Sequence, residues 1–191
     1  MKLGFIGAGN MGGAIIRGFI KSNKVNARDI LVTRKNKAAL KDMEDDLGIT
    51  ACENSAILAE KSDVIFMAVK PVMFSSVIDE IREQVKKSDP LVVSMAAGLT
   101  TDKIRDMFGF DVRIVRIMPN INAEILMSAT SVCKNSTASD EDMEMIKDLL
   151  SSIGLATEVS ENMFSVFSAI AGCSPAYVYM FIDALARGAQ K

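Results

Sequence analysis

Residues 2–12 decide the fold, and they read Lys-Leu-Gly-Phe-Ile-Gly-Ala-Gly-Asn-Met-Gly. The apolar run at residues 3–6 is typical of a buried parallel strand. Three glycines follow at once with the spacing G-x-G-x-x-G, and the apolar residues after them recur at helical spacing. A strand, a glycine turn and a helix in this order predict a site for a dinucleotide pyrophosphate. A glycine-rich turn without a ligand is the alternative interpretation.

Each glycine has a distinct expected role. Gly7 allows the tight turn, Gly9 allows close approach of the phosphates, and Gly12 allows the helix to pack closely on the strand. The unpaired N–H groups at the start of the helix are expected to hold the negative charge of the pyrophosphate.

Composition narrows the function. The chain has 191 residues, is 49% hydrophobic and carries a net charge of −2, so we expect a sizeable core and no nucleic-acid-binding face. No apolar run approaches the roughly 20 residues of a membrane span, and no signal peptide is expected. The three cysteines lack metal-ligand spacing, which favours reduced thiols and a cytoplasmic location.

The chain contains no histidine. This excludes the commonest general acid or base and any Ser-His or Cys-His dyad. Chemistry must then come from hydroxyls, lysines, carboxylates or a cofactor, and a redox cofactor fits best because it performs the difficult step itself.

Strand and helix patterns alternate from residue 2 to about residue 159. This predicts a mostly parallel, doubly wound α/β domain of the Rossmann type. We assign residues 1–159 to this domain and residues 160–191 to the start of an all-α domain. Strands are expected at residues 3–6, 29–33, 49–51, 63–69, 91–95, 112–117 and 129–133. Ser55 and Thr101 are expected to cap helices, and Gly48 and Gly154 to end the helices before them. The apolar stripe of another helix is formed by Phe74, Val77, Ile78, Ile81 and Val85.

The end of the second strand bears on cofactor choice. An NAD-specific Rossmann domain usually has an acidic residue there for the ribose 2′-hydroxyl, but this chain has Thr33-Arg34-Lys35-Asn36. A hydroxyl and two cations suit a 2′-phosphate, so we predict NADPH over NADH. A solvated basic turn is the alternative.

Later strand ends supply further candidates, because ligands of open α/β sheets lie at the carboxyl ends of the strands. The strand at residues 63–69 leads into Lys70 and Pro71, and the strand at residues 91–95 leads into Ala96-Ala97-Gly98. Arg113 and Arg116, on the sixth strand, are expected at edge or solvent positions.

Two helices are expected after residue 160, at about residues 161–171 and 175–187, and the last of them is apolar almost all round. It is expected to start with Ser174 as its cap and Pro175 as its first residue and to run to Arg187. A helix that is hydrophobic on every side must be covered on every side. We therefore expect these 191 residues to be an N-terminal portion of a longer polypeptide or one half of an intertwined oligomer.

Five blocks together resemble the pyrroline-5-carboxylate reductase family over essentially the whole chain. They are Phe5-Ile-Gly-Ala-Gly-Asn-Met11, Ala68-Val-Lys-Pro71, Ala96-Ala-Gly98, Met118-Pro-Asn120 and Gly172-Cys-Ser-Pro-Ala-Tyr177. The resemblance implies a Rossmann domain followed by an all-α dimerisation domain, and a homodimer or higher homo-oligomer. It also implies hydride transfer from NADPH or NADH to the C=N carbon of pyrroline-5-carboxylate, the final step of proline biosynthesis.

The resemblance assigns site residues by position. For the cofactor they are Phe5, Ile6, Gly7, Ala8, Gly9, Asn10, Met11, Gly12, Thr33, Arg34, Asn54, Ala68, Val69, Lys70, Pro71, Ala96, Ala97 and Gly98. Asn120 and Glu161 are implied near the substrate, and a surface charge is the alternative for Glu161. No metal is implied.

The chain departs from the family pattern in places. Asn120-Ile-Asn-Ala123 stands where the family usually has Asn-Thr-Pro-Ala, and Met127-Ser128 replaces an acidic-glycine pair. The family's substrate-contacting Ser-Pro-Gly-Gly-Thr-Thr block lies beyond Lys191, so no catalytic residue is assigned. We expect these 191 residues alone to bind cofactor at best.

Two other functions remain open at this point. One is a different small Rossmann reductase, of the hydroxyacid or deazaflavin-linked kind. The other is a non-catalytic dinucleotide-binding module. Oxidation of NADPH with pyrroline-5-carboxylate, compared with 2-keto acids, distinguishes the three.

Overall fold

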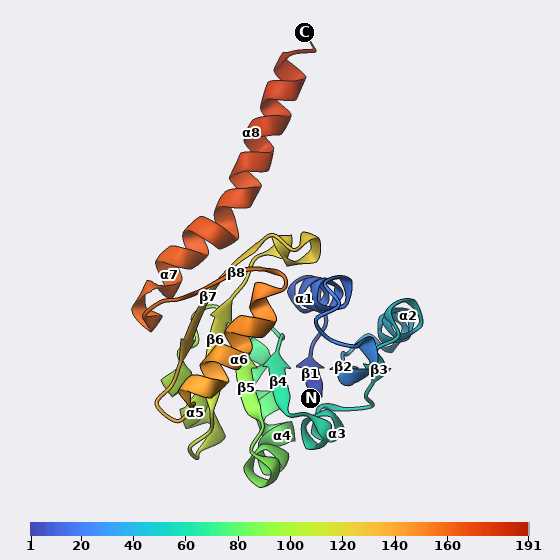
Figure 1. Ribbon diagram of the computed structural model, residues 1–191, viewed down its shortest axis with the longest axis vertical. Coiled ribbons are helices and arrows are strands. Elements are labelled where there is room, and N and C mark those ends of the chain that lie inside the picture. The colour runs from blue at the N-terminus through green and yellow to red at the C-terminus, as the bar shows by residue number, and fades with distance from the viewer. Residues whose placement is uncertain (191) are drawn as a thin grey trace.

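The computed structural model describes residues 1–190. Over this range the chain forms one eight-stranded sheet in the order β3-β2-β1-β4-β5-β6-β7-β8 (Figure 1). The strands are β1 (Leu3–Ile6), β2 (Ile30–Thr33), β3 (Thr50–Ala51), β4 (Val64–Met67), β5 (Leu91–Ser94), β6 (Ile114–Met118), β7 (Ser128–Lys134) and β8 (Gly154–Glu158). The first six strands run parallel, β7 is antiparallel to β6, and β8 is parallel to β7. The Rossmann-type sheet expected from the sequence is confirmed.

Helices cover both faces of the sheet, which is the doubly wound arrangement. They are α1 (Asn10–Lys21), α2 (Lys37–Leu47), α3 (Ser55–Lys61), α4 (Phe74–Ser88), α5 (Thr101–Phe108) and α6 (Asp140–Ser151). One core joins α1, α2 and α6 to the sheet, and the other joins α3, α4 and α5 to the opposite face. The strand between them alternates: Phe5 of β1 faces the first core and Ile6 the second.

Short 3-10 helices fill the connections. They are η1 (Ala27–Asp29), η2 (Pro71–Met73), η3 (Ile121–Ile125) and η4 (Glu161–Met163).

An aromatic cluster supports the first βα turn from below. Phe5 of β1 stacks on Phe66 of β4, with ring centroids 4.5 Å apart, and Phe19 of α1 meets both rings edge-on. All three side chains are fully buried. Since β1, β4 and α1 are fixed to one another by these rings, the glycine turn above them has a rigid base.

Several helix boundaries differ from the sequence predictions. Asn54, and not Ser55, caps α3, because its Oδ1 accepts the Ile57 N–H. Thr100, and not Thr101, caps α5. Gly154 begins β8, which the periodicity had not indicated. The pattern located α3 and α5 and missed their caps by one residue, because neighbouring polar residues compete for the same cap.

The break expected between the two C-terminal helices is wrong. Ser174 does not cap the last helix: α7 (Phe164–Phe167), the π-helix η5 (Ser168–Cys173) and α8 (Ser174–Gly188) follow one another without a break. Figure 1 shows α8 projecting away from the sheet, and none of its residues is buried. By length and composition alone, residues 161–188 also qualify as a membrane span, with a mean hydropathy of 1.4 over an 18-residue window. The sequence expectation of no such run was wrong on this criterion.

Candidate functional site

The largest cavity described here lies at the carboxyl ends of β1, β2 and β4 and holds about 660 Å³. This is the point where the strand order reverses direction, between β1 and β4, and ligands of open α/β sheets bind there. Its lining residues are Ile6, Gly7, Ala8, Gly9, Thr33, Arg34, Lys35, Asn36, Lys37, Glu53, Asn54, Ser55, Ala68, Val69, Lys70, Met73, Ser76, Val77 and Glu80. Most of the predicted cofactor residues are therefore brought together.

The three glycines of the turn have the three environments that their predicted roles require. Gly7 has a φ of +93°, and a Cβ there would lie 2.7 Å from the Ala68 carbonyl oxygen. A Cβ on Gly12 would lie 2.7 Å from the Gly7 carbonyl oxygen. A Cβ on Gly9 would meet nothing within 4 Å, because Gly9 faces open space. The first two positions need glycine for the protein's own packing, and Gly9 leaves room for a ligand.

Anion binding suits the start of α1. Gly9 is its N-cap, so no side chain caps the first N–H groups, and the first turn contains no acidic residue. Uncapped N–H groups and the positive end of the helix dipole favour a phosphate. The residues thus fit the pyrophosphate of a dinucleotide.

The part of the cavity at the end of β2 carries positive charge. Thr33 is buried at the end of β2, and Arg34 next to it is half-buried and forms no ion pair with any residue in the range 1–190. Lys37 donates from Nζ to the Glu53 carbonyl oxygen at 2.5 Å. Sequence reasoning left Lys37 out, because a lysine at the start of a helix carries no distinguishing signal.

Some assigned residues lie outside this cavity. Phe5 is fully buried in the core below the turn, and Asn10, Met11, Gly12 and Pro71 do not line the space. Phe5 and Gly12 support the turn through packing, whereas Asn10 and Met11 are the first residues of α1.

A second cavity of about 360 Å³ lies farther along the same edge, beside the ends of β5 and β6. Its lining residues are Ala97, Gly98, Thr100, Arg116, Met118, Glu161, Asn162, Phe164, Ser165 and Ser168. Ala96 is buried and does not contribute to the lining. The turn at residues 96–98 thus faces the base of the C-terminal helix.

Asn120 connects the end of β6 to the C-terminal helix. Its side chain is 6% exposed, and Nδ2 donates to the Ala171 carbonyl oxygen at 3.0 Å, within the π-helix. Its Oδ1 is buried and has no hydrogen-bond partner among residues 1–190. The role of Asn120 near the substrate stays a prediction.

Arg116 is buried, so the expected solvent or edge position was wrong. The side chain is 6% exposed, and NH1 pairs with Glu161 Oε1 at 3.0 Å. The Phe164 ring lies 4.5 Å below the guanidinium carbon. A charged residue in a strand indicated an edge position. The sequence pattern gave no sign of Glu161, which covers Arg116 and lies 45 residues farther along the chain.

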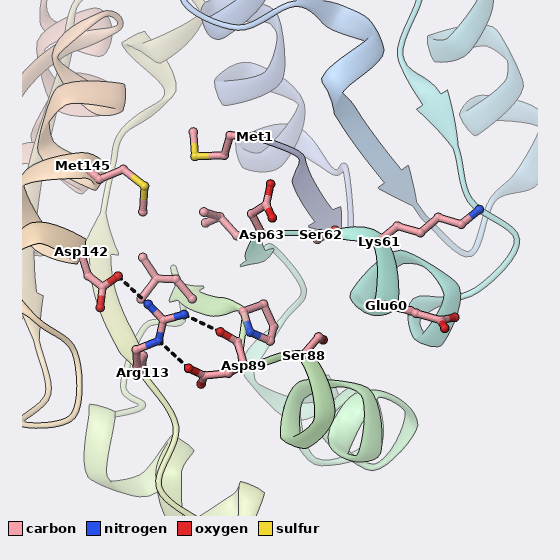
Figure 2. Close-up of a pocket in the computed structure, with 13 residues that line it drawn as sticks. Met1, Glu60, Lys61, Ser62, Asp63, Ser88, Asp89, Arg113, Asp142 and Met145 are labelled. Atoms are coloured by element: carbon pink, nitrogen blue, oxygen red, sulfur yellow. Dashed lines mark hydrogen bonds and ion pairs between the residues drawn. The ribbon is translucent and has the colours of Figure 1, made fainter.

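Figure 2 shows a third cavity, of about 430 Å³, at the opposite, amino-terminal edge of the sheet. There Arg113 lies between two carboxylates, with Nε at 3.1 Å from Asp89 and NH1 at 2.7 Å from Asp142. The guanidinium also donates to the Asp89 carbonyl oxygen. Arg113 ties α4, β6 and α6 together far from the glycine turn, and its guanidinium pairs with both Asp89 and Asp142.

Comparison with known families matches two segments. Residues 2–98 match the family "NADP oxidoreductase coenzyme F420-dependent", and residues 161–191 match "Pyrroline-5-carboxylate reductase dimerisation". The first match covers the glycine turn through the turn at residues 96–98. The second covers the C-terminal helical segment.

Curated relatives match nearly the whole chain. The pyrroline-5-carboxylate reductase of Escherichia coli is 39% identical over 98% of this chain and 70% of its own length. Pyrroline-5-carboxylate reductase 2 of Bacillus subtilis is 38% identical over 100% of this chain and 68% of its own. This chain therefore spans roughly two thirds of their length.

Solved structures agree. The pyrroline-5-carboxylate reductase of Coxiella burnetii superposes with a TM-score of 0.90 at 30% identity, covering 99% of this chain and 70% of its own. A Plasmodium falciparum pyrroline carboxylate reductase, solved with NADP bound, has a TM-score of 0.88 at 30% identity, covering 99% of this chain and 69% of its own. Prephenate dehydrogenase of Aquifex aeolicus, at 14% identity and a TM-score of 0.71, shares the fold alone.

Proposed function

The chain belongs to the pyrroline-5-carboxylate reductase family, and we propose that the cavity along its glycine turn holds the dinucleotide for that family's reaction. The protein is an NAD(P)H-dependent oxidoreductase that reduces the C=N bond of 1-pyrroline-5-carboxylate to proline. The open space at Gly9, with no side-chain cap on the helix behind it, is the observation that carries the cofactor site.

The residues of this chain bind and orient. The glycine turn and the start of α1 hold the pyrophosphate, and Thr33 and Arg34 hold the adenosine end. When bound, the reduced nicotinamide supplies a hydride to the imine carbon. A protonated imine is already electrophilic, so the chain needs to position the reactants and exclude water more than to move protons. The absence of histidine is compatible with this demand.

We infer a preference for NADPH. Arg34 is half-buried and lines the cavity together with Thr33, and a guanidinium and a hydroxyl suit a 2′-phosphate. Arg34→Ala should weaken NADPH binding by about tenfold, the scale of one lost charge-assisted hydrogen bond, and leave NADH binding unchanged. Arg28→Ala, which removes an arginine outside the cavity lining, is the control. Equal weakening of both dinucleotides would contradict the assignment.

The remaining assignments follow the same family. The chain forms homo-oligomers, and we assign the contact to the exposed apolar surface of α8. We assign residues 1–159 to the cofactor domain and residues 160–191 to the dimerisation domain, supported by the family match that starts at residue 161. A cytoplasmic location and the absence of nucleic-acid or membrane partners stay predictions.

The test of function is a substrate comparison with the full-length polypeptide. Consumption of NADPH is followed with pyrroline-5-carboxylate and, in parallel, with 2-keto acids. We expect NADPH to be consumed with pyrroline-5-carboxylate and not with 2-keto acids. Turnover with keto acids alone would indicate a hydroxyacid-type reductase. Binding of NADPH with no turnover of any imine would indicate a non-catalytic module.

A further inference from the structure

The turn at residues 96–98 is weakly held by its own neighbours. Ala97 and Gly98 are exposed, Gly98 has a φ of +77°, and a Cβ on Gly98 would meet nothing within 4 Å. Within the turn, Ala96 N–H donates to Ser94 Oγ at 3.3 Å, a long hydrogen bond. A turn with so few contacts needs an anchor from elsewhere to keep one conformation.

Glu161 supplies such an anchor from the C-terminal segment. Its Oε1 accepts the Thr101 backbone N–H at 2.8 Å, and its Oε2 accepts the Thr101 hydroxyl at 3.2 Å. Thr101 is the first residue of α5 and is separated from the turn only by Leu99 and Thr100. The carboxylate therefore fixes the point at which the turn enters the helix.

The same carboxylate is fixed to the sheet through Arg116. Arg116 NH1 donates to Glu161 Oε1 at 3.0 Å, and β6 places Arg116 directly beside Ser94, the last residue of β5. The ring of Phe164, 1% exposed, supports the guanidinium from the other side. Glu161 thus joins the start of α5 to the strand next to β5, across the two ends of the turn.

We propose that Glu161 is a positioning residue that holds the turn at residues 96–98 where the nicotinamide half of the dinucleotide lies. The inference rests on the proposed cofactor site. The pyrophosphate at the glycine turn and the adenosine at the end of β2 leave the nicotinamide on the β4–β5 side of the switch point. The carboxylate itself already binds three donors, so its effect on the cofactor is exerted through the turn.

Two ligands distinguish an effect on the nicotinamide half of the site from an effect on the adenosine half. NADPH occupies the whole site, and adenosine 2′,5′-bisphosphate occupies only the adenosine end. Both affinities are measured for the full chain, for Glu161→Gln and for Glu158→Gln. The last variant is the control, since Glu158 is exposed and its partner Lys147 Nζ lies 4.0 Å away. The emission of bound NADPH reports how the nicotinamide ring is held.

Glu161→Gln is expected to weaken NADPH about tenfold and to shift the nicotinamide emission, with affinity for the bisphosphate unchanged. Glu158→Gln is expected to match the parent in all three measurements. Unchanged NADPH affinity and emission in Glu161→Gln would overturn the inference, and so would equal weakening of both ligands. Failure of the parent protein to bind either ligand would instead overturn the proposed function, and the inference with it.

Glu161→Gln leaves Arg116 buried without a counter-ion, which destabilises the fold. A second variant keeps the inference testable if Glu161→Gln does not fold. The double variant Arg116→Met/Glu161→Met removes both charges and still removes the anchor on Thr101. It is expected to fold and to show the same selective loss of NADPH affinity. Parent-like NADPH affinity in the double variant would overturn the inference.

Discussion

Gly9 and Gly12 differ in the space that surrounds an added Cβ atom, and this difference gives a prediction. Gly9→Ala should leave the free energy of unfolding unchanged, because the new methyl group enters open space, but it should weaken NADPH because that space is where the phosphates bind. Gly12→Ala should cost about 1 to 3 kcal/mol in stability, because its Cβ would meet the Gly7 carbonyl oxygen. Urea unfolding and NADPH titration measure both effects.

Gly188→Ala is the control for this pair, since Gly188 also has no neighbour within 4 Å but lies far from the cavity. Gly188→Ala should change neither the free energy of unfolding of the cofactor-binding domain nor its affinity for NADPH. Normal NADPH affinity in Gly9→Ala would show that the phosphates bind elsewhere.

Cys133 gives a prediction about pH. Burial in β7, with a smaller contribution from the Glu161 carboxylate, raises the pKa of its thiol from 9.0 to about 12. Below pH 9 the thiol is neutral in both states. As pH rises from 9 towards 12 the unfolded chain loses the proton and the folded chain keeps it, so this contribution to stability is lost.

The measurement compares the wild type with Cys133→Ala by urea unfolding. Between about pH 8 and about pH 10.5, the wild type should lose about 1 to 2 kcal/mol more than the variant. Parallel losses in the two proteins would show that the thiol titrates normally in the fold.

Single residues were predicted from sequence where their role is local. The glycines follow from the backbone geometry of a βα turn, and Gly48 was correctly placed at the end of α2, with a φ of +70°. Arg116 was misjudged because its burial depends on Phe164 and Glu161, which no local pattern connects to it.

At the scale of elements, α8 presents an apolar face without a partner in the described chain. Its exposed apolar residues at helical spacing include Val178, Phe181, Ile182 and Leu185, each more than half exposed. A charge placed there should oppose association, because it would be buried unpaired in the contact. Phe181→Glu should therefore lower the assembled mass measured by light scattering.

Asp183→Asn is the matched control on the same helix, since Asp183 is exposed and pairs with Arg187 one turn later. It should assemble as the parent does. An unchanged mass for Phe181→Glu would place the oligomer contact on another surface.

Elements were predicted well where one face is apolar. The stripe of α4 was read correctly, with Phe74, Val77, Ile78, Ile81 and Val85 all buried. Strand β8 was missed because most of its residues are exposed or half-buried, which leaves no apolar alternation. The continuous helix through residues 164–188 was missed because Ser174 and Pro175 are also the sequence signal for a helix start.

At the scale of the whole molecule, the alternation of strands and helices was sufficient to predict a Rossmann-type sheet. The sheet order and the antiparallel placement of β7 were not predicted, since periodicity within an element says nothing about its neighbours. The site follows from topology, because the order places β1 beside β4 and opens a crevice at their carboxyl ends.

A crystal structure of the protein with NADP⁺ tests the central claim most directly. The account predicts density for the pyrophosphate on the N–H groups at Gly9 and the start of α1. It also predicts the 2′-phosphate beside Thr33 and Arg34, and the nicotinamide towards residues 96–98. Density for the dinucleotide at any other surface, with this crevice empty, would contradict it.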